Sequence, residues 1–589
     1  MIRRAAGVGM VLVMAAACGG APAPGAKTTS GAERGQAEPA SDRGAVVSDL
    51  VLLHGRIFTA DAERPEVQAL AIWRGRVLAV GGDDDIRPLI GAQTRVIDLA
   101  NRRAVPGMRD SHVHFLSGGL ELSRVALKDA ANEAELGRRL VEYDRKLAPG
   151  RWMLGGRWEH EHTLAGRLPD AALLDKYVPN RPVFLSRYDG HMAVANSRAL
   201  AIAGIDARTA DPPGGAIVRK PGSRTPTGIL RDNAMDLVWG KVPPLGDDEI
   251  VEAVRAATRE AHRSGVTAVE DMDGSDPATR ARLLGTYQRL AQSGELGVRV
   301  ALYWPLADYG ELARAGVRAS FGSDWVRIGG VKGFVDGSIG SSTAKMFTPY
   351  LNEPDSTGLF VTQPEKLREW IGAADSAGLA VAVHAIGDRA NADLLSIFAQ
   401  VAQKNGGPPH RFRIEHAQIL RPEDLTRFAS SGVIASMQPY HAVDDGGWIE
   451  RRIGAARLTA AYAWRSLLDK GATLAFGSDW PVAPLSPLTG IDAAVNRRTL
   501  DGKHPEGWFP AERISAREAV VAYTRSAAFA ARRELDEGSL APGKLGDVVV
   551  LSHDILDPAA RNEIATAHVM LTIAGGQVVH EQSSSSPSR

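Results

Sequence analysis

The chain has 589 residues, of which 44% are hydrophobic and 23% charged, a composition typical of a globular protein large enough for more than one domain. Lys plus Arg and Asp plus Glu both number 69, so the formal net charge is zero and no basic excess favours binding to nucleic acid. Beyond the N-terminal segment, no apolar stretch reaches the roughly 20 residues of a membrane-spanning helix.

The N-terminal segment has the pattern of a bacterial export signal. Arg3 and Arg4 precede an apolar stretch that is too short to cross a bilayer and that ends in small residues. The ending AAAC before Gly19 resembles a lipobox, in which Cys18 becomes lipidated. We therefore expect residues 1–18 to be a lipoprotein signal peptide, and the exported protein to be held in the bacterial cell envelope by a lipid on Cys18. The alternative is a plain signal peptide with an incidental cysteine.

The segments that flank the centre of the chain differ from it in composition. Cys18 is the only cysteine, which excludes an intrachain disulfide and a thiolate site in the rest of the chain. Residues 19–48 are rich in Gly, Ala, Pro and Ser and lack apolar periodicity, which predicts a flexible tether. Short β-rich runs fill residues 49–104 and return in residues 536–585, so we expect the two ends to pair into one small domain.

Residues 105–535 alternate short apolar strands with amphipathic helical patterns, which is typical of βα units in a parallel sheet. Eight strands can be identified, from AVPGMRDSHVH at residues 104–114 to ATLAFGSD at residues 472–479. Eight such units predict a closed barrel with its active site at the carboxyl ends of the strands. Residues 120–255 or thereabouts interrupt the pattern between the first two strands and predict a large insertion near the barrel mouth.

Polar residues stand at the ends of these strands. His112 and His114 are separated by one residue, so in a strand both imidazoles face the same side. Imidazole and carboxylate suit divalent ions such as zinc, whose catalytic sites keep a position for water. Taken singly, each histidine could be a structural group, Lys332 could pair with Asp336, and Asp479 could cap a helix. The strand-end residues, in chain order, are His112, His114, Lys332, His384, His416 and Asp479.

The ordered set of motifs resembles the amidohydrolase superfamily, and more narrowly amidohydrolase family 3, the branch of N-substituted formamide deformylase and YtcJ-like proteins. The resemblance covers nearly all of residues 49–585. It implies an α/β fold, a TIM-like (β/α)8 metal-dependent hydrolase barrel with a small composite β-sandwich built from both chain ends. The matching stretches include VPGMRDSHVHF, DGHMAVANSRAL, VKGFVDGSIGSSTA, VHAIGDRA, RFRIEHAQ, FGSDWPV and GSLAPGKLGDVVVL.

The resemblance also implies a centre of one or two zinc ions. His112, His114 and Asp479 would hold one ion, and His384 and His416 the other. Lys332 would bridge them as a carboxylated lysine, a carbamate formed with carbon dioxide. A metal-activated hydroxide would attack the carbonyl of a small-molecule amide, with Asp479 as general base and then acid. The expected activity is hydrolysis of a non-peptide C–N bond.

Several assignments have open alternatives. His191, Asp189 and Asp336 are candidate substrate-binding residues, but their DGH and VDGS motifs are also ordinary turn sequences. Asp232 stands where the family more usually has glutamate, and the surroundings of Glu270 are atypical. The same centre would serve a cyclic amide or ester hydrolase or a deaminase. An inactive lipoprotein that binds a metal or solute is the alternative outside enzymes, and the sequence leaves a homo-oligomer open.

Overall fold

The computed structural model describes residues 47–274, 276–407 and 410–582. The predicted signal peptide, Cys18 and all but the last two residues of the predicted tether lie outside these ranges. Within them, no helix combines the length and apolar character needed to cross a membrane.

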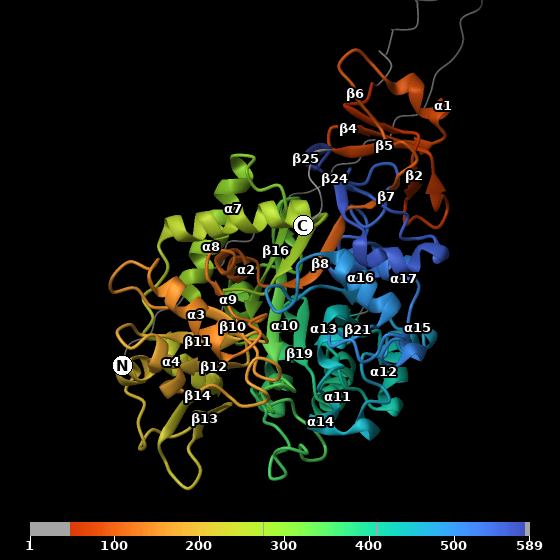
Figure 1. The fold of residues 1–589 in the computed structure, drawn as a ribbon. Coiled ribbons are helices and arrows are strands. Elements are labelled where there is room, and N and C mark those ends of the chain that lie inside the picture. The colour runs from red at the N-terminus through yellow and green to blue at the C-terminus, as the bar shows by residue number, and fades with distance from the viewer. Residues whose placement is uncertain (1–46, 275, 408–409, 583–589) are drawn as a thin grey trace, which may run out of the picture. The chain divides into compact units, whose positions relative to one another are not determined.

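Eight parallel strands form the central barrel, the number predicted from the sequence, and the short strand β17 (Phe321–Gly322) pairs with one of them (Figure 1). Neighbouring strands pair in parallel from first to last, which confirms the predicted TIM-like barrel. Their apolar side chains are buried, as expected for strands covered by helices. In order, they are β8 (Met108–Val113), β15 (Val266–Asp271), β16 (Arg299–Pro305), β18 (Val326–Phe334), β19 (Val381–Ala385), β20 (Arg413–His416), β21 (Ile434–Met437) and β22 (Leu474–Phe476).

Polar contacts join the end of the last strand to the first. Asp110 on β8 accepts hydrogen bonds from the backbone N–H of Ser478 at 2.9 Å and from its hydroxyl at 2.5 Å. The backbone N–H of Asp479 donates to the carbonyl of His112 at 2.7 Å. Gly477 permits this approach, because a Cβ there would lie 2.6 Å from the backbone nitrogen of His112. Two strand ends far apart in sequence are thereby fixed beside each other.

Helices follow the strands around the barrel. In α7 (Asp247–Arg263) the residues that face the barrel, Ile250, Val254, Ala257 and Ala261, recur at helical spacing and are buried. The other helices that contact barrel elements include α2 (Phe115–Glu121), α8 (Pro277–Gln292), α9 (Tyr309–Arg314), α10 (Pro364–Ser376), α11 (Asp388–Asn405), α12 (Leu425–Ser431), α13 (Pro439–Asp445), α15 (Trp464–Asp469), α16 (Pro487–Asn496), α17 (Ala516–Tyr523) and α18 (Arg525–Ala530).

The interruption between β8 and β15 is a sheet with its own apolar cores. The chain returns to the barrel at α7, which packs against α2. Its strands pair in the order β13 (Gly215–Arg219), β14 (Pro226–Asp232), β12 (Met192–Ala195), β11 (Phe184–Arg187), β10 (Gly155–Trp158) and β9 (Val125–Ala126), with helices α3 (Glu133–Asp144), α4 (Ala171–Tyr177), α5 (Ser197–Ala203) and α6 (Asp236–Trp239).

The two ends of the described chain form a pair of sheets. Val549 pairs with Val105, which places C-terminal strands beside N-terminal ones (Figure 1). Side chains from both sheets, Leu52, Leu70 and Ile573 among them, share one apolar core. The sheets have the orders β5 (Arg76–Gly81), β4 (Ala69–Trp73), β1 (Leu50–Leu53), β6 (Arg95–Asp98), and β25 (Gln577–Glu581), β24 (Val569–Ala574), β23 (Val548–Leu551), β7 (Arg103–Pro106), β2 (Arg56–Phe58), β3 (Glu66–Val67).

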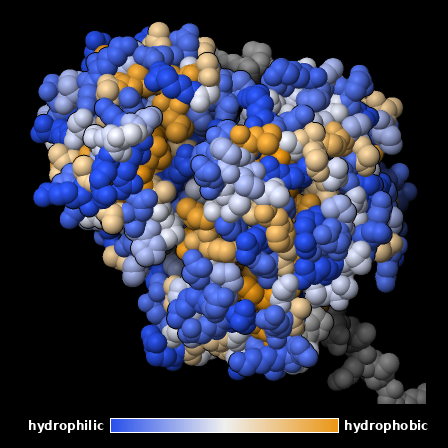
Figure 2. Space-filling view, turned by 90° about the horizontal axis from the view of Figure 1, so that it is seen from below, coloured by the Kyte–Doolittle hydropathy of each residue, from blue (hydrophilic) through white to orange (hydrophobic). Residues whose placement is uncertain are grey.

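The surface shown in Figure 2 is mostly hydrophilic, with hydrophobic residues gathered in separate patches. The exposed large hydrophobic residues of the described chain, such as Phe321, Leu351 and Leu535, stand in distant segments of the sequence. Scattered exposure of this kind is ordinary for globular proteins. The search for a functional site therefore turns to the carboxyl ends of the barrel strands.

Candidate metal centre at the barrel mouth

The structure brings all six predicted metal-ligand residues to one cavity of about 300 Å³. The imidazole of His416 has its ring centroid 4.8 Å from that of His112 and 4.5 Å from that of His384. The rings of His112 and His114 lie 5.7 Å apart. Four histidines from three strand ends thus surround one space, with Lys332 and Asp479 in its walls.

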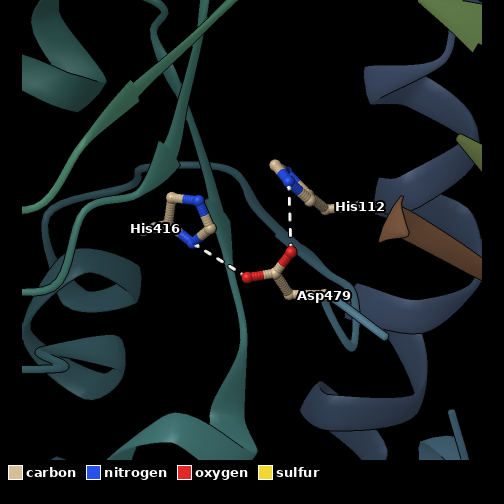
Figure 3. Close-up of side chains that lie close together, drawn as sticks. All are labelled: His112, His416 and Asp479. Carbon is tan, nitrogen blue, oxygen red and sulfur yellow. Dashed lines mark ion pairs between the residues drawn. The ribbon is translucent and has the colours of Figure 1, made fainter. Parts of the chain in front are cut away.

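Figure 3 shows the core of this group, in which the imidazoles of His112 and His416 both face the carboxylate of Asp479. His112 Nε2 lies 3.5 Å from Asp479 Oδ1, and His416 Nδ1 lies 4.0 Å from Asp479 Oδ2. One donor atom from each of the three buried residues lies within 4.8 Å of the others. Two imidazoles and one carboxylate are a ligand combination that zinc takes in catalytic sites.

Hydrogen bonds orient two of the histidines for ligation. His112 Nδ1 donates to Glu415 Oε2 at 2.6 Å, which leaves Nε2 buried and without a hydrogen-bond partner. His384 Nε2 donates to the carbonyl of Gly337 at 3.1 Å, which leaves the lone pair of Nδ1 available to a metal ion. Metal-binding histidines are typically held in this way by a carboxylate or a carbonyl on the other nitrogen. The residues present therefore fit a divalent ion.

His114 and Asp479 form the most strongly charged contact of the group. His114 Nδ1 lies 3.3 Å from Asp273, and its Nε2 lies 3.3 Å from Asp479. Burial opposes a charge on His114, but its hydrogen bonds to the two carboxylates outweigh burial and raise its pKa to about 10. Burial also opposes a charge on Asp479, yet the attraction of His112 and His114 holds the pKa of this carboxyl below its ordinary value. Asp479 is therefore ionised.

Lys332 is buried and lies beside the ring of Phe334. Burial lowers the pKa of its amine to about 8, against the attraction of Glu415 and Asp479. Its Nζ lies 4.3 Å from the ring centroid of Phe334. The alternative partner, Asp336, instead accepts backbone hydrogen bonds from Lys345, Ile386 and Gly387 at 2.7–3.1 Å.

The three candidate substrate-binding residues have different positions. His191 and Asp189 line the cavity, whereas Asp336 is not among its lining residues. His191 Nδ1 lies 2.7 Å from Asp232 Oδ1, and its ring centroid lies 4.8 Å from that of His384. Asp232, the aspartate at the position where glutamate is more usual, therefore orients His191. Asp189 accepts a hydrogen bond from Ser338 Oγ at 2.5 Å and pairs with Arg187.

Buried charges beneath the histidines were not identified from the sequence. Glu415, the partner of His112, also accepts a hydrogen bond from Arg413 Nε at 2.9 Å. Arg413 bonds in turn to Glu270, which accepts from Tyr303 at 2.8 Å. The atypical Glu270 thus belongs to an ionic network inside the barrel. Charged residues within apolar strands, as in RFRIEH, were the available signal.

Two of the candidate ligands have an uncommon backbone conformation. The φ angles of His416 and Asp479 are 75° and 60°, in the left-handed region that residues other than glycine rarely occupy. Such conformations cost about 1–3 kcal/mol each and cluster at functional sites. Here they lie at the two strand ends whose side chains meet in Figure 3.

A parallel eight-stranded barrel whose strand ends present four histidines, a lysine and an aspartate is an arrangement that can hold a metal ion. A family model described as "Amidohydrolase family" matches residues 95–580, and the chain belongs to this family. This result confirms the resemblance noted in the sequence at the level of the family.

Individual relatives cover almost the whole chain. Protein LONG AFTER FAR-RED 3 of Arabidopsis thaliana is 40% identical, over 91% of this chain and 92% of its own. N-substituted formamide deformylase of Arthrobacter pascens is 27% identical, over 91% of this chain and 99% of its own. Among solved structures, an uncharacterized metal-dependent hydrolase from Pyrococcus furiosus has a TM-score of 0.67 and 30% identity, covering 86% of this chain and 100% of its own.

Proposed function

We propose that this protein is a metal-dependent hydrolase of a non-peptide C–N bond in a linear amide. The observation that carries the proposal is the convergence of four histidines and Asp479, with His112 Nε2 buried, oriented and unpartnered. The similarity to N-substituted formamide deformylase over nearly the full length of both chains supports an amide substrate. The ligands would be His112, His114, His384, His416, Asp479 and a carboxylated Lys332, holding one or two zinc ions.

A divalent ion bound there would supply a Lewis acid and lower the pKa of a bound water. Asp479 is ionised and lies within 4.0 Å of His112, His114 and His416, so it can take a proton from the attacking water. It can return that proton to the leaving nitrogen, a transfer that typically contributes about 10²–10⁴-fold to the rate. His191, oriented by Asp232, would use its other ring nitrogen to position the amide.

Carboxylation of Lys332 agrees with its surroundings. An ammonium group facing divalent ions would repel them, whereas a carbamate is an anionic oxygen ligand. The burial that lowers the lysine pKa to about 8 increases the fraction of neutral amine, which is the form that adds carbon dioxide. The cavity has no competing carboxylate hydrogen-bonded to this amine among the described residues.

A substrate panel tests the proposal. We expect purified protein to release formate or another acid from N-formyl and N-acyl amines, to lose this activity on treatment with a chelator, and to regain it with zinc. Turnover confined to cyclic amides, esters or amino-substituted heterocycles would instead support the alternative hydrolase or deaminase. Stoichiometric binding of a solute without turnover of any compound would support the binding lipoprotein.

We further propose that the protein is anchored in the cell envelope through Cys18. Replacing Cys18 by serine removes the only thiol that a lipid could modify. We expect the variant to move from the membrane fraction to the soluble fraction, as measured by immunoblotting after cell fractionation. A Cys18→Ser protein that stays in the membrane fraction would contradict lipid anchoring.

A further inference from the structure

One wall of the cavity carries an arginine whose guanidinium forms no ion pair with a carboxylate among the described residues. Arg157 lies at the register shift in β10, with a φ of 50° that turns it out of the regular strand. Its side chain lines the cavity that also holds the six candidate metal ligands. Only its Nη2 makes a hydrogen bond, to the carbonyl of Val482 at 2.9 Å, and its Nε is buried without a partner.

The surrounding charges leave this cation in excess. Lys128 also approaches the Val482 carbonyl, at 3.4 Å, but its charge is balanced by Asp444 at 2.7 Å. On the other side, Glu121 lies 3.6 Å from Arg124 and pairs with that residue. Burial raises the pKa of Glu121, against the attraction of both Arg124 and Arg157. Lys128 and Arg124 therefore each pair with a carboxylate, whereas Arg157 does not.

A largely buried guanidinium without a counter-charge destabilises the folded protein unless a bound ligand supplies that charge. Burial of a charge without a partner costs several kcal/mol, and an arginine offers a planar fork of donors that fits a carboxylate. The attraction of the acidic groups around Arg157 does not offset its burial, and its pKa is lowered. Trp239, Phe334 and Pro481 line the same cavity and give it apolar surface.

We propose that Arg157 binds a carboxylate on the part of the substrate distant from the scissile bond, so that the substrate is an amide with an apolar body and an anionic end. The inference rests on the proposed amide hydrolysis and specifies its substrate class. The insertion, which contributes Arg157 through β10, then selects substrates while the barrel contributes the reacting groups.

The test compares two compounds of the same shape, 4-(formamidomethyl)benzoate and its neutral counterpart 4-(formamidomethyl)benzamide. Their dissociation constants are measured by calorimetry, and their KM and kcat by formate release, with the metal-loaded full chain. We expect the benzoate to bind at least about 30-fold more tightly than the benzamide, the lower end of the effect of removing one partner from a buried charge pair. Direct binding of a carboxylate to the metal would be common to all variants and would not respond to Arg157.

Three variants test whether the preference for the benzoate depends on Arg157. Arg157→Gln is expected to reduce the preference for the benzoate to less than about threefold, mainly through KM. Arg157→Lys, which keeps the charge but loses the planar fork, is expected to show an intermediate preference. Arg138→Gln is the control, because Arg138 belongs to the same insertion, pairs with Glu135 and Glu142 and does not line the cavity, and this variant should keep the wild-type preference.

Each outcome separates this inference from the proposed function. Equal affinity of the wild-type protein for the two compounds, or a full preference retained in Arg157→Gln, overturns the carboxylate site even if both compounds are hydrolysed. A preference that depends on Arg157 in the absence of hydrolysis overturns the proposed reaction but supports the site. If Arg157→Gln does not fold, the Arg157→Lys protein decides, since an unchanged preference there contradicts recognition by a planar fork.

Discussion

Replacing Asp479 by asparagine is expected to lower kcat/KM for a formamide by about 10²–10⁴-fold, the range for loss of general acid–base transfer. Asparagine keeps the size of the side chain and one oxygen, but its amide cannot take and return a proton. The four histidines are unchanged, so the metal content should stay close to that of the wild-type protein. The measurement is hydrolysis rate together with metal analysis of the same preparation.

Asp444→Asn is a suitable control for this result. Asp444 lines the neighbouring part of the barrel mouth, where it pairs with Lys128 rather than with the histidines. We expect this variant to lose less than tenfold in kcat/KM for a neutral formamide. An Asp479→Asn protein that keeps more than a tenth of wild-type activity would contradict the assignment of Asp479 as the proton-transferring group.

Replacing Lys332 by alanine is expected to release bound metal and to lower activity by more than about 100-fold, the upper range for disturbing groups that only support a metal ligand. Removal of the bridge leaves space in a cavity lined by histidines. Acetate or propionate could occupy that space and supply the missing carboxylate oxygens, so added short acids should restore part of both metal content and activity. Labelling with ¹³C-bicarbonate should give a carbamate signal in the wild-type protein that is absent from the variant.

Lys345→Ala provides the matched comparison. The amine of Lys345 donates to Thr357 and to the carbonyl of Gly358, and it does not line the cavity of the candidate ligands. Its replacement should leave metal content unchanged. Full metal content in Lys332→Ala, with no response to added acids, would show that this lysine does not bridge the ions.

The barrel could be predicted from the sequence because most of its strands are short apolar runs and several of these runs end near a polar residue. His384 and His416 close such runs, and the regular alternation with helices places their ends at one rim. The convergence of ligand-type residues follows from this regularity, since the carboxyl ends of all parallel strands meet at the same side. The local sequence pattern was therefore sufficient to predict the barrel and the convergence of the ligand-type residues.

Residues whose positions depend on contacts between distant strands could not be predicted in the same way. Glu415 on β20 orients His112 on β8, and these two strands are not neighbours in the sheet. Asp273, in the loop after β15, orients His114. VDGS left open whether Asp336 contacts substrate or belongs to a turn, and in the structure both of its oxygens accept backbone hydrogen bonds. The positive φ angles of Arg157 and Asp479 also have no signature in the residue types.

The most direct test of the account is the metal content and coordination of the purified wild-type protein and of a His112→Ala/His384→Ala variant. We predict one or two divalent ions per wild-type chain, with X-ray absorption showing nitrogen and oxygen ligands at about 2.0–2.2 Å. A folded double variant should bind none at this site. A folded wild-type protein that takes up no divalent ion from added zinc, or a double variant with unchanged uptake and spectrum, would contradict a metal centre at the barrel mouth.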